Sequence, residues 1–195
     1  MHANGMMRIA ITGGIGSGKS FFCRMLQRYG IEVYDCDAAA KRLMRYSRDL
    51  RDSLVGLVGD DLYEGGVLQK HLLASFILSS VENATAVNDI VHPAVAADFM
   101  GSGFAWLESA IYFSSGFYKR VSIDRVVCVT APLEVRVARI MHRDGISREK
   151  SLEWINCQWS QAEMLRMSDY EIVNDGIADV DKQTRLLLEK LKINE

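Results

Sequence analysis

The feature that most constrains this chain is a glycine-rich run at residues 13–20, GGIGSGKS, which fits the pattern G-x-x-x-x-G-K-[ST] without a mismatch. The apolar segment before it, residues 8–12, is predicted to be a buried strand. Apolar residues recur at helical spacing after it, so a helix is expected to begin near Lys19. Strand, glycine loop and helix form the context in which this pattern binds phosphate.

The chemistry of such a loop follows from its backbone. Glycines permit conformations in which successive N–H groups converge on one anion, and the helix N-terminus adds further donors and a positive dipole end. We expect Lys19 to reach the β- and γ-phosphates and the Ser20 hydroxyl to hold Mg²⁺. The run therefore predicts a site for a nucleoside triphosphate and Mg²⁺. The residues expected to line it are Gly14, Ile15, Gly16, Ser17, Gly18, Lys19, Ser20 and Phe21.

Composition excludes several other partners. The 195 residues suit one α/β core with an insertion, and the formal charge of −2 with no basic run argues against nucleic acid or an anionic membrane. The four cysteines are far apart and form no C-x-x-C pair, which predicts reduced thiols. No apolar run is long enough to span a membrane and no leader-like segment precedes the first strand, so a cytoplasmic protein is expected.

Two carboxylates follow a second short strand, predicted at residues 31–34. Asp35 and Asp37 come after its carboxyl end, the side of an open α/β sheet on which ligands bind. One carboxylate would hold Mg²⁺ through water, and we assign this role to Asp35. The other, Asp37, would accept a proton from an attacking hydroxyl. The alternative is that Asp37 serves as the N-cap of the following helix.

The rest of the chain alternates between helical and strand patterns. Residues 49–66 are expected to be irregular and turn-rich, and His92-Pro93 is expected to interrupt and kink the second of two helices that follow. Ser147 is expected to cap a helix running through Trp154 and Gln158. The predicted elements are helices at 69–80, 83–100, 133–142 and 179–192, and strands at 104–111, 125–130 and within 168–176. This order predicts a three-layer α/β/α fold with a parallel sheet.

Three arginines lie on one face of the predicted helix at 133–142 and its end. Arg136, Arg139 and Arg143 are spaced i, i+3 and i+7. One interpretation is a solvated helix surface. The other is that some of them belong to a mobile lid that clamps phosphates.

Short motifs narrow the class of phosphate-binding protein. The guanine-reading motif N-K-x-D and the transporter motif L-S-G-G-Q are both absent from the sequence. What remains is a small-molecule kinase, in which the protein mainly positions the reactants and neutralises charge.

At this level of detail the chain is similar to the dephospho-coenzyme A kinase family, over residues 7–191. The narrowest match is the string TGGIGSGKS at residues 12–20. The other matching residues are Asp35, Asp37, Arg42, His92, Pro93, Gly116, Arg139, Arg143, Asp144, Gln158, Asp169 and Asn174.

The resemblance implies a reaction and a set of roles. ATP with Mg²⁺ would be the donor and the ribose 3′-hydroxyl of dephospho-coenzyme A the acceptor. Asp37 would be the catalytic base, with Lys19 and Arg143 also catalytic. Arg139 and Asn174 would bind ATP, and Asp35, Arg42 and His92 would contact the acceptor or order its site.

The resemblance also implies three parts. The nucleotide core would comprise residues 7–37, 104–135 and 166–195, the helical acceptor domain residues 38–103 and the lid residues 136–165. The partners would be small molecules alone, and the chain would be a monomer or a weak homo-oligomer.

Three positions depart from the family pattern. Ser114 stands where relatives carry a glutamate, Phe21 where they carry a threonine, and Lys70 where they often carry an arginine. Glu108 is too far along its strand to replace the lost carboxylate directly.

Two rival functions stay open at this point: a nucleoside-monophosphate or shikimate-type kinase, and a catalytically silent nucleotide-binding regulator.

Overall fold

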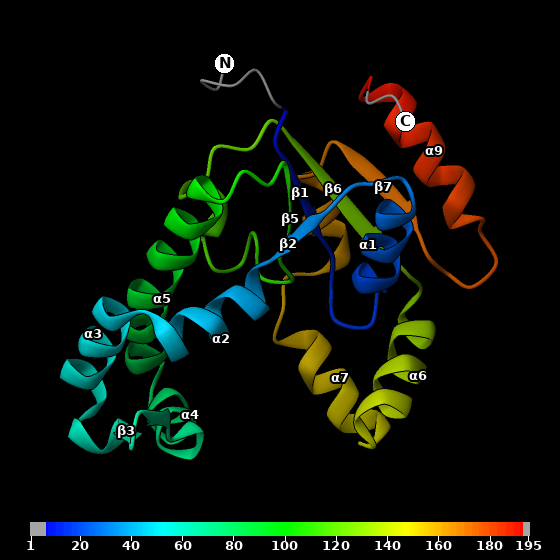
Figure 1. Ribbon diagram of the computed structural model, residues 1–195. Helices are drawn as coiled ribbons and strands as arrows, with labels where there is room; N and C mark the ends of the chain where they lie inside the picture. Colours follow the sequence, from blue (N-terminus) through cyan, green and yellow to red (C-terminus); the bar gives the residue numbers. More distant parts are fainter. Residues whose placement is uncertain (1–6, 193–195) are drawn as a thin grey trace. The chain divides into compact units, whose positions relative to one another are not determined.

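A computed structural model describes residues 7–192 of the chain and divides into two compact units (Figure 1). The first unit contains the described residues up to Tyr34 and those from Phe104 onward. The second contains Asp35–Gly103.

The first unit is built on a sheet of five strands in the order β2-β5-β1-β6-β7. β1 pairs in parallel with β5 and with β6, and β6 pairs in parallel with β7. The sheet confirms the predicted α/β class, and it places β1, which leads into the glycine loop, between two neighbours. The strands are β1 Ile9–Thr12, β2 Val33–Asp35, β5 Trp106–Glu108, β6 Arg125–Thr130 and β7 Tyr170–Val173.

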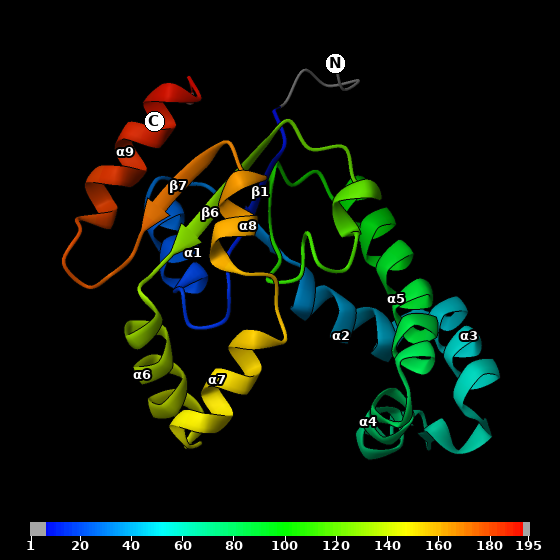
Figure 2. The same cartoon turned by 180° about the vertical axis from the view of Figure 1, so that it is seen from behind.

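Two helices cover one face of this sheet. Alternate residues of a strand share a face, and Ile9 and Ile11 of β1 lie in one buried cluster with Val127 and Val129 of β6. The same cluster contains side chains of α1 (Lys19–Arg28) and α9 (Val180–Lys190). Figures 1 and 2 show α1 and α9 on one side of the sheet and the short helix α8 (Gln161–Arg166) on the other.

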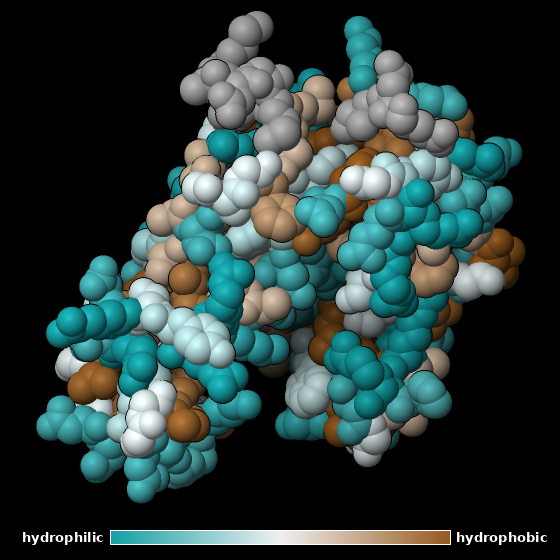
Figure 3. Space-filling model, in the orientation of Figure 1, coloured by the Kyte–Doolittle hydropathy of each residue, from teal (hydrophilic) through white to brown (hydrophobic). Residues whose placement is uncertain are grey.

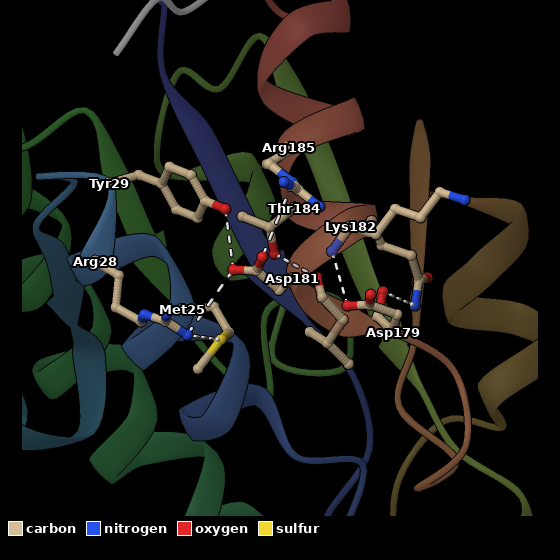
Figure 4. A network of polar contacts seen from close by, with 10 residues as sticks. Met25, Arg28, Tyr29, Asp179, Asp181, Lys182, Thr184 and Arg185 are labelled. Atoms are coloured by element: carbon tan, nitrogen blue, oxygen red, sulfur yellow. Dashed lines mark hydrogen bonds and ion pairs between the residues drawn. The ribbon is translucent and has the colours of Figure 1, made fainter.

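Polar contacts also join α1 to α9 (Figure 4). The Tyr29 hydroxyl, just after α1, donates to Asp181 Oδ1 at 2.9 Å. Arg28 and Arg185 lie 3.9 Å from the two oxygens of the same carboxylate. Asp179 caps α9 by accepting from the Lys182 N–H at 2.9 Å. These contacts are half-exposed, so the buried apolar cluster contributes most of the stability of this helix pair.

The second unit is helical apart from a two-stranded hairpin. Its helices are α2 Cys36–Tyr46, α3 Arg48–Val58, α4 Lys70–Ser79 and α5 Val81–Gly101, and the hairpin pairs β3 Tyr63–Glu64 with β4 Val67–Leu68.

The sequence-based expectation of irregular structure from residue 49 was wrong for α3. Ser47 caps this helix by accepting from Leu50 N–H, and Leu50 and Leu54 are buried on one face, one turn apart. Gly56 and the many charged residues hid this weak periodicity. The turn-rich part begins at Gly59, where the helix ends and a 3-10 turn, Asp60–Leu62, leads into the hairpin.

The expected interruption at His92-Pro93 was also wrong. Pro93 lies inside α5, which continues from Val81 to Gly101. A proline removes one helical hydrogen bond, but Val87, Val91, Val95 and Phe99 are all buried on the same helix. Tertiary packing therefore overrides the local break.

The remaining helices of the first unit differ from expectation at their ends. α6 covers Leu133–Asp144, and α7 covers Arg148–Asn156, capped by Ser147 as predicted. α7 stops before Gln158. The separate helix α8 was not predicted, although its capping box, in which Ser160 and Glu163 bond each other's backbone N–H, is visible in the sequence.

The four cysteines are all free thiols, as predicted. Cys36 and Cys128 are buried, and Cys157 is exposed. Burial, followed by the nearby Glu171 carboxylate, raises the pKa of the Cys128 thiol to about 11. Cys128 therefore stays protonated and unreactive in the folded protein at neutral pH.

The surface carries scattered apolar side chains among hydrophilic ones (Figure 3). In the second unit Val67, Leu78 and Val81 are at least 65% exposed. Single exposed apolar residues of this kind are normal on soluble domains. Within residues 7–192, no helix is both long and apolar enough to cross a membrane.

Two neighbouring leucines of α9 provide a matched test of the core. Leu188 is 4% exposed and belongs to the buried cluster, whereas Leu186 is 46% exposed. We expect Leu188→Ala to lower the free energy of unfolding by about 2–5 kcal/mol because it leaves a cavity under the sheet. Leu186→Ala should change it by less than about 0.5 kcal/mol. Urea denaturation of both variants measures the difference, and equal losses would contradict this packing.

Candidate active site

The glycine loop connects β1 to α1 with three glycines at positive φ. Gly13, Gly16 and Gly18 have φ of 144°, 80° and 93°, values that side-chain-bearing residues rarely adopt. Gly18 is the residue immediately before α1, so the loop ends at a helix N-terminus. The predicted sequence of strand, loop and helix is present.

Space as well as backbone conformation requires glycine here. A Cβ at Gly16 would lie 2.7 Å from the carbonyl oxygen of Arg136 in α6. A Cβ at Gly18 would overlap the side-chain amide of Asn174, which follows β7. The loop therefore packs directly against α6 and against the residue after the last strand.

Side-chain donors from these elements hold the carbonyl groups of the loop. Arg136 Nε donates to the Ile15 carbonyl at 2.9 Å, and Arg139 Nη1 donates to those of Gly16 and Ser17 at 3.3 and 3.2 Å.

Asn174 completes this arrangement. Its Nδ2 donates to the Ser17 carbonyl at 3.0 Å, and its Oδ1 accepts from Arg139 Nη2 at 3.3 Å. The C=O and N–H of a trans peptide point in opposite directions, so a carbonyl held from one side directs the N–H of the same peptide to the other side. N–H groups on that side favour an anion.

Some N–H groups of the loop already have partners. The Ser17 N–H donates to the Gly14 carbonyl at 3.1 Å. Ile15 N–H donates to Gln158 Oε1 at 2.7 Å, across 143 residues of sequence. Gln158 lies in the segment between α7 and α8, so this segment contacts the phosphate loop directly.

Arg136 places a buried cation at the base of the loop. It is 4% exposed, and burial lowers the pKa of its guanidinium. Among the described residues its Nη2 has no hydrogen-bond partner, and the same holds for the buried hydroxyls of Thr12 and Ser17. An incompletely paired buried cation favours an anion nearby, which fits the polyphosphate predicted for this loop.

Lys19 extends back along the loop. Its Nζ donates to the Gly13 carbonyl at 3.0 Å and lies 3.6 Å from Glu108 Oε1, at the end of β5. The two side chains are 11% and 16% exposed, so this ion pair is largely shielded from water.

The paired aspartates lie where the second unit begins. Asp35 ends β2 and caps α2, because its Oδ1 accepts from the Ala38 N–H at 2.9 Å. The alternative that Asp37 is the cap is therefore wrong. With Asp37 as the cap the helix would start at residue 38, but it starts two residues earlier, at Cys36. Asp37 lies in the first turn of α2 with an exposed side chain.

Arg42 and His92, two of the three residues expected to contact the acceptor or order its site, both lie in the second unit. Arg42 forms a hydrogen-bonded ion pair with Asp98 of α5. His92, also on α5, is 8% exposed. This burial suits a histidine that orders its surroundings.

The three arginines of α6 do not act alike. Arg136 and Arg139 contact the loop, so a solvated surface is the wrong interpretation for them. Arg143 is exposed and pairs with Asp144, which raises the pKa of its guanidinium. Of the three, Arg143 is the most exposed, and its role in a lid stays a prediction.

Two residues predicted to hold Mg²⁺ carry oxygen atoms, the kind of ligand that this ion takes. Among residues 7–192 no three histidine, cysteine or acidic side chains gather as a metal cluster. Mg²⁺ usually takes one or two carboxylates together with substrate phosphates and water. Ser20 is exposed at the start of α1 in the first unit, and Asp35 is exposed at the start of the second. That both oxygens hold Mg²⁺ stays a prediction.

Comparison with known proteins decides the family. The family model described as dephospho-CoA kinase matches residues 7–179. The dephospho-CoA kinase of Porphyromonas gingivalis is 42% identical over 176 residues, covering 87% of this chain and 86% of that protein. The chain belongs to the dephospho-CoA kinase family. The corresponding protein of Bacteroides fragilis is 38% identical over 87% of this chain and 85% of its own length.

Solved structures agree on the fold. A protein from Thermus thermophilus is 30% identical and superposes with a TM-score of 0.81, covering 97% of this chain and 99% of its own. A shikimate kinase from Acinetobacter baumannii, solved with shikimate, is 16% identical with a TM-score of 0.58, covering 96% of this chain and 94% of its own. The second likeness shows the shared P-loop kinase fold alone.

The sequence alone did not predict the contacts that Arg136, Gln158 and Glu108 make with loop residues. Arg136 was considered only as one of three arginines on a helix face, Gln158 was given no role, and the role of Glu108 was left open. A carboxylate that ends an apolar strand was a usable signal for Glu108. The hydrogen bonds from Arg136 and Gln158 to Ile15 form because α6 and the segment after α7 pack against the loop. No local sequence pattern predicts that packing.

Replacing Gly16 by alanine tests how tightly α6 holds the loop. Gly16→Ala combines a strained φ with a clash against the backbone of α6, so we expect a loss of more than about 1–3 kcal/mol, the cost of the strain alone. Gly56→Ala is the control, because Gly56 lies in α3 and a Cβ added there would meet no atom within 4 Å, and it should gain about 0.4–1 kcal/mol. Both are measured by urea denaturation, and a neutral Gly16→Ala would refute the close approach.

Proposed function

We propose that this chain transfers the γ-phosphoryl group of ATP to the ribose 3′-hydroxyl of dephospho-coenzyme A, giving coenzyme A. The observation that carries the proposal is the preformed phosphate loop, with its carbonyls held by Arg136, Arg139 and Asn174, in a chain of the dephospho-CoA kinase family. Phosphoryl transfer needs positioning and charge neutralisation above all, and this loop supplies both.

The loop residues would bind the triphosphate of ATP through their N–H groups. Lys19 would turn from the Gly13 carbonyl to the β- and γ-phosphates, which a flexible four-carbon side chain allows. Ser20 and Asp35 would hold Mg²⁺, which when bound neutralises charge on the phosphates. Arg139 and Asn174 would act on the nucleotide mainly by fixing the loop.

Asp37 would accept the proton of the attacking hydroxyl. Its exposed carboxylate in the first turn of α2 is accessible to a substrate, whereas Asp35 already accepts a hydrogen bond at the helix cap. The compact helical unit at Asp35–Gly103 supports an acceptor domain at residues 38–103, in which Arg42 and His92 contact or order the acceptor.

Residues 136–165 would serve as the lid, and Arg143 would exchange its partner Asp144 for the phosphates of ATP on closure. The proposal further includes a cytoplasmic location and a monomeric or weakly associated state.

The reaction is tested with purified protein, ATP and Mg²⁺ on a panel of acceptors: dephospho-coenzyme A, adenosine, AMP and shikimate. ADP release together with mass analysis identifies the phosphorylated product and the hydroxyl modified. We expect turnover with dephospho-coenzyme A alone. Turnover with shikimate or AMP instead would favour another small-molecule kinase, and tight ATP binding with no turnover would favour a silent regulator.

Asp37→Asn tests the catalytic base. Removing the proton acceptor should lower kcat about 10²–10⁴-fold, because general-base catalysis contributes this much, while the Kd for ATP changes little. Asp49→Asn is the matched control, since Asp49 is an exposed carboxylate in the first turn of the next helix, α3. A change in KM for dephospho-coenzyme A at unchanged kcat would assign Asp37 to binding instead.

Lys19→Met tests charge stabilisation at the transferred phosphoryl group. The neutral side chain keeps the length of the stem, so we expect kcat to fall about 10²–10³-fold, as for other preorganised electrostatic groups. Single-turnover kinetics at saturating ATP separates this effect from weaker binding. A variant that retains near-normal kcat would remove Lys19 from the mechanism.

A further inference from the structure

Gln158 brings a neutral amide to the start of the glycine loop. Its Oε1 accepts a hydrogen bond from the Ile15 N–H at 2.7 Å, and Arg136 Nε donates to the Ile15 carbonyl at 2.9 Å. All three residues lie in the first unit. A side-chain oxygen thus occupies a loop N–H group that an incoming anion could use.

The backbone of Gln158 is fixed by the segment between α7 and α8 (Figure 2). The Gln158 N–H bonds the Ile155 carbonyl at the end of α7 at 3.2 Å. The next side chain, Trp159, stacks on Phe113 with ring centroids 6.0 Å apart, and Ser160 forms the capping box that begins α8. Because the backbone is held on both sides, the side-chain torsions of Gln158 alone decide which end of its amide faces the loop.

The other end of this amide is a donor. Nε2 carries two N–H groups, and among residues 7–192 the structure gives it no hydrogen-bond partner. Oε1 and Nε2 are bonded to the same carbon, so Nε2 lies within about 5 Å of the Ile15 nitrogen. The last torsion of a glutamine is broad and roughly two-fold, so a rotation that exchanges the two ends costs little. The loop then faces a donor instead of an acceptor.

Gln158 contacts the end of the loop at which the terminal phosphate of a triphosphate is expected. The lysine of such a loop reaches the β- and γ-phosphates. Lys19 extends back to this end, where its Nζ donates to the Gly13 carbonyl at 3.0 Å, two residues before Ile15. The N–H groups at the start of α1 lie at the opposite end of the loop and suit the inner phosphates.

The amide suits both an empty and an occupied loop. A carboxylate would accept from the Ile15 N–H but repel a phosphate. A lysine or arginine would bond a phosphate but has no acceptor for the N–H. Glutamine serves both states by exchanging Oε1 for Nε2.

We propose that Gln158 is a specificity-determining residue that lets the loop distinguish ATP from ADP. In the empty loop its Oε1 occupies the Ile15 N–H. With ATP bound, Nε2 donates to the γ-phosphate, a contact that ADP lacks. The inference rests on the proposed function, because it assumes that the loop binds ATP.

The test is calorimetric titration of the full chain with Mg²⁺-ATP and with Mg²⁺-ADP, without acceptor. Gln158→Met keeps the length of the side chain but removes the donor, so it should lower the ratio of ATP affinity to ADP affinity about tenfold, the effect of losing a hydrogen bond to a charged group. Gln158→Glu keeps an acceptor for the Ile15 N–H but adds repulsion, so the ratio should fall at least as far.

Gln161→Glu is the matched control. Gln161 lies in the same part of the chain, and its Oε1 accepts from the Ala131 N–H at 3.0 Å instead of from the loop. The variant introduces the same charge and keeps this acceptor, so its affinity ratio should equal that of wild type. Thermal unfolding confirms that each variant is folded.

The outcomes separate this inference from the proposed function. An equal loss of ATP and ADP affinity in both Gln158 variants would show that the side chain only supports the loop, and would overturn the inference while the proposed function stands. An equal fall of the ratio in Gln161→Glu would also overturn it, because added charge alone would then explain the effect. If wild type bound neither nucleotide, the proposed function itself would fail, and the inference with it.

Discussion

The structure depends on how the carbonyl groups of the glycine loop are held. A loop that presents several N–H groups to one anion must direct its C=O groups elsewhere, and buried carbonyls need donors. Arg136, Arg139 and Asn174 supply these donors. Because the donors are side chains of packed elements, the loop is preorganised, and little ordering cost remains for ligand binding.

This requirement also explains why arginines lie between the loop and α6. An arginine offers several donors in a fixed plane, so Arg139 can bond two successive carbonyls and the amide of Asn174 together. Lysine could not reproduce that geometry. The same guanidinium groups bring positive charge close to a loop that must accept a triphosphate, so support and electrostatic attraction come from the same side chains.

The sequence predicted the elements whose signals are local. The loop motif, the apolar strands at 8–12 and 125–130 and the amphipathic helix α9 depend on short-range periodicity, and the structure confirms them. The prediction from sequence was wrong at α3, where Gly56 and charged residues mask a narrow apolar face. It was also wrong at Pro93, where packing keeps α5 helical although proline disfavours a helix. The bonds from Gln158 and Arg136 to Ile15 join residues more than 100 positions apart, so only the folded topology reveals them.

The bond from Asn174 to Ser17 spans 157 residues and has a consequence for biosynthesis. The glycine loop is among the first parts of the chain to leave the ribosome, but its supports follow from the final third of the sequence. Contacts this distant in sequence form late and slow folding. A nascent or truncated chain ending before Asn174 therefore carries the complete motif without its mature shape, and the earliest-made part of the nucleotide site is among the last to become competent.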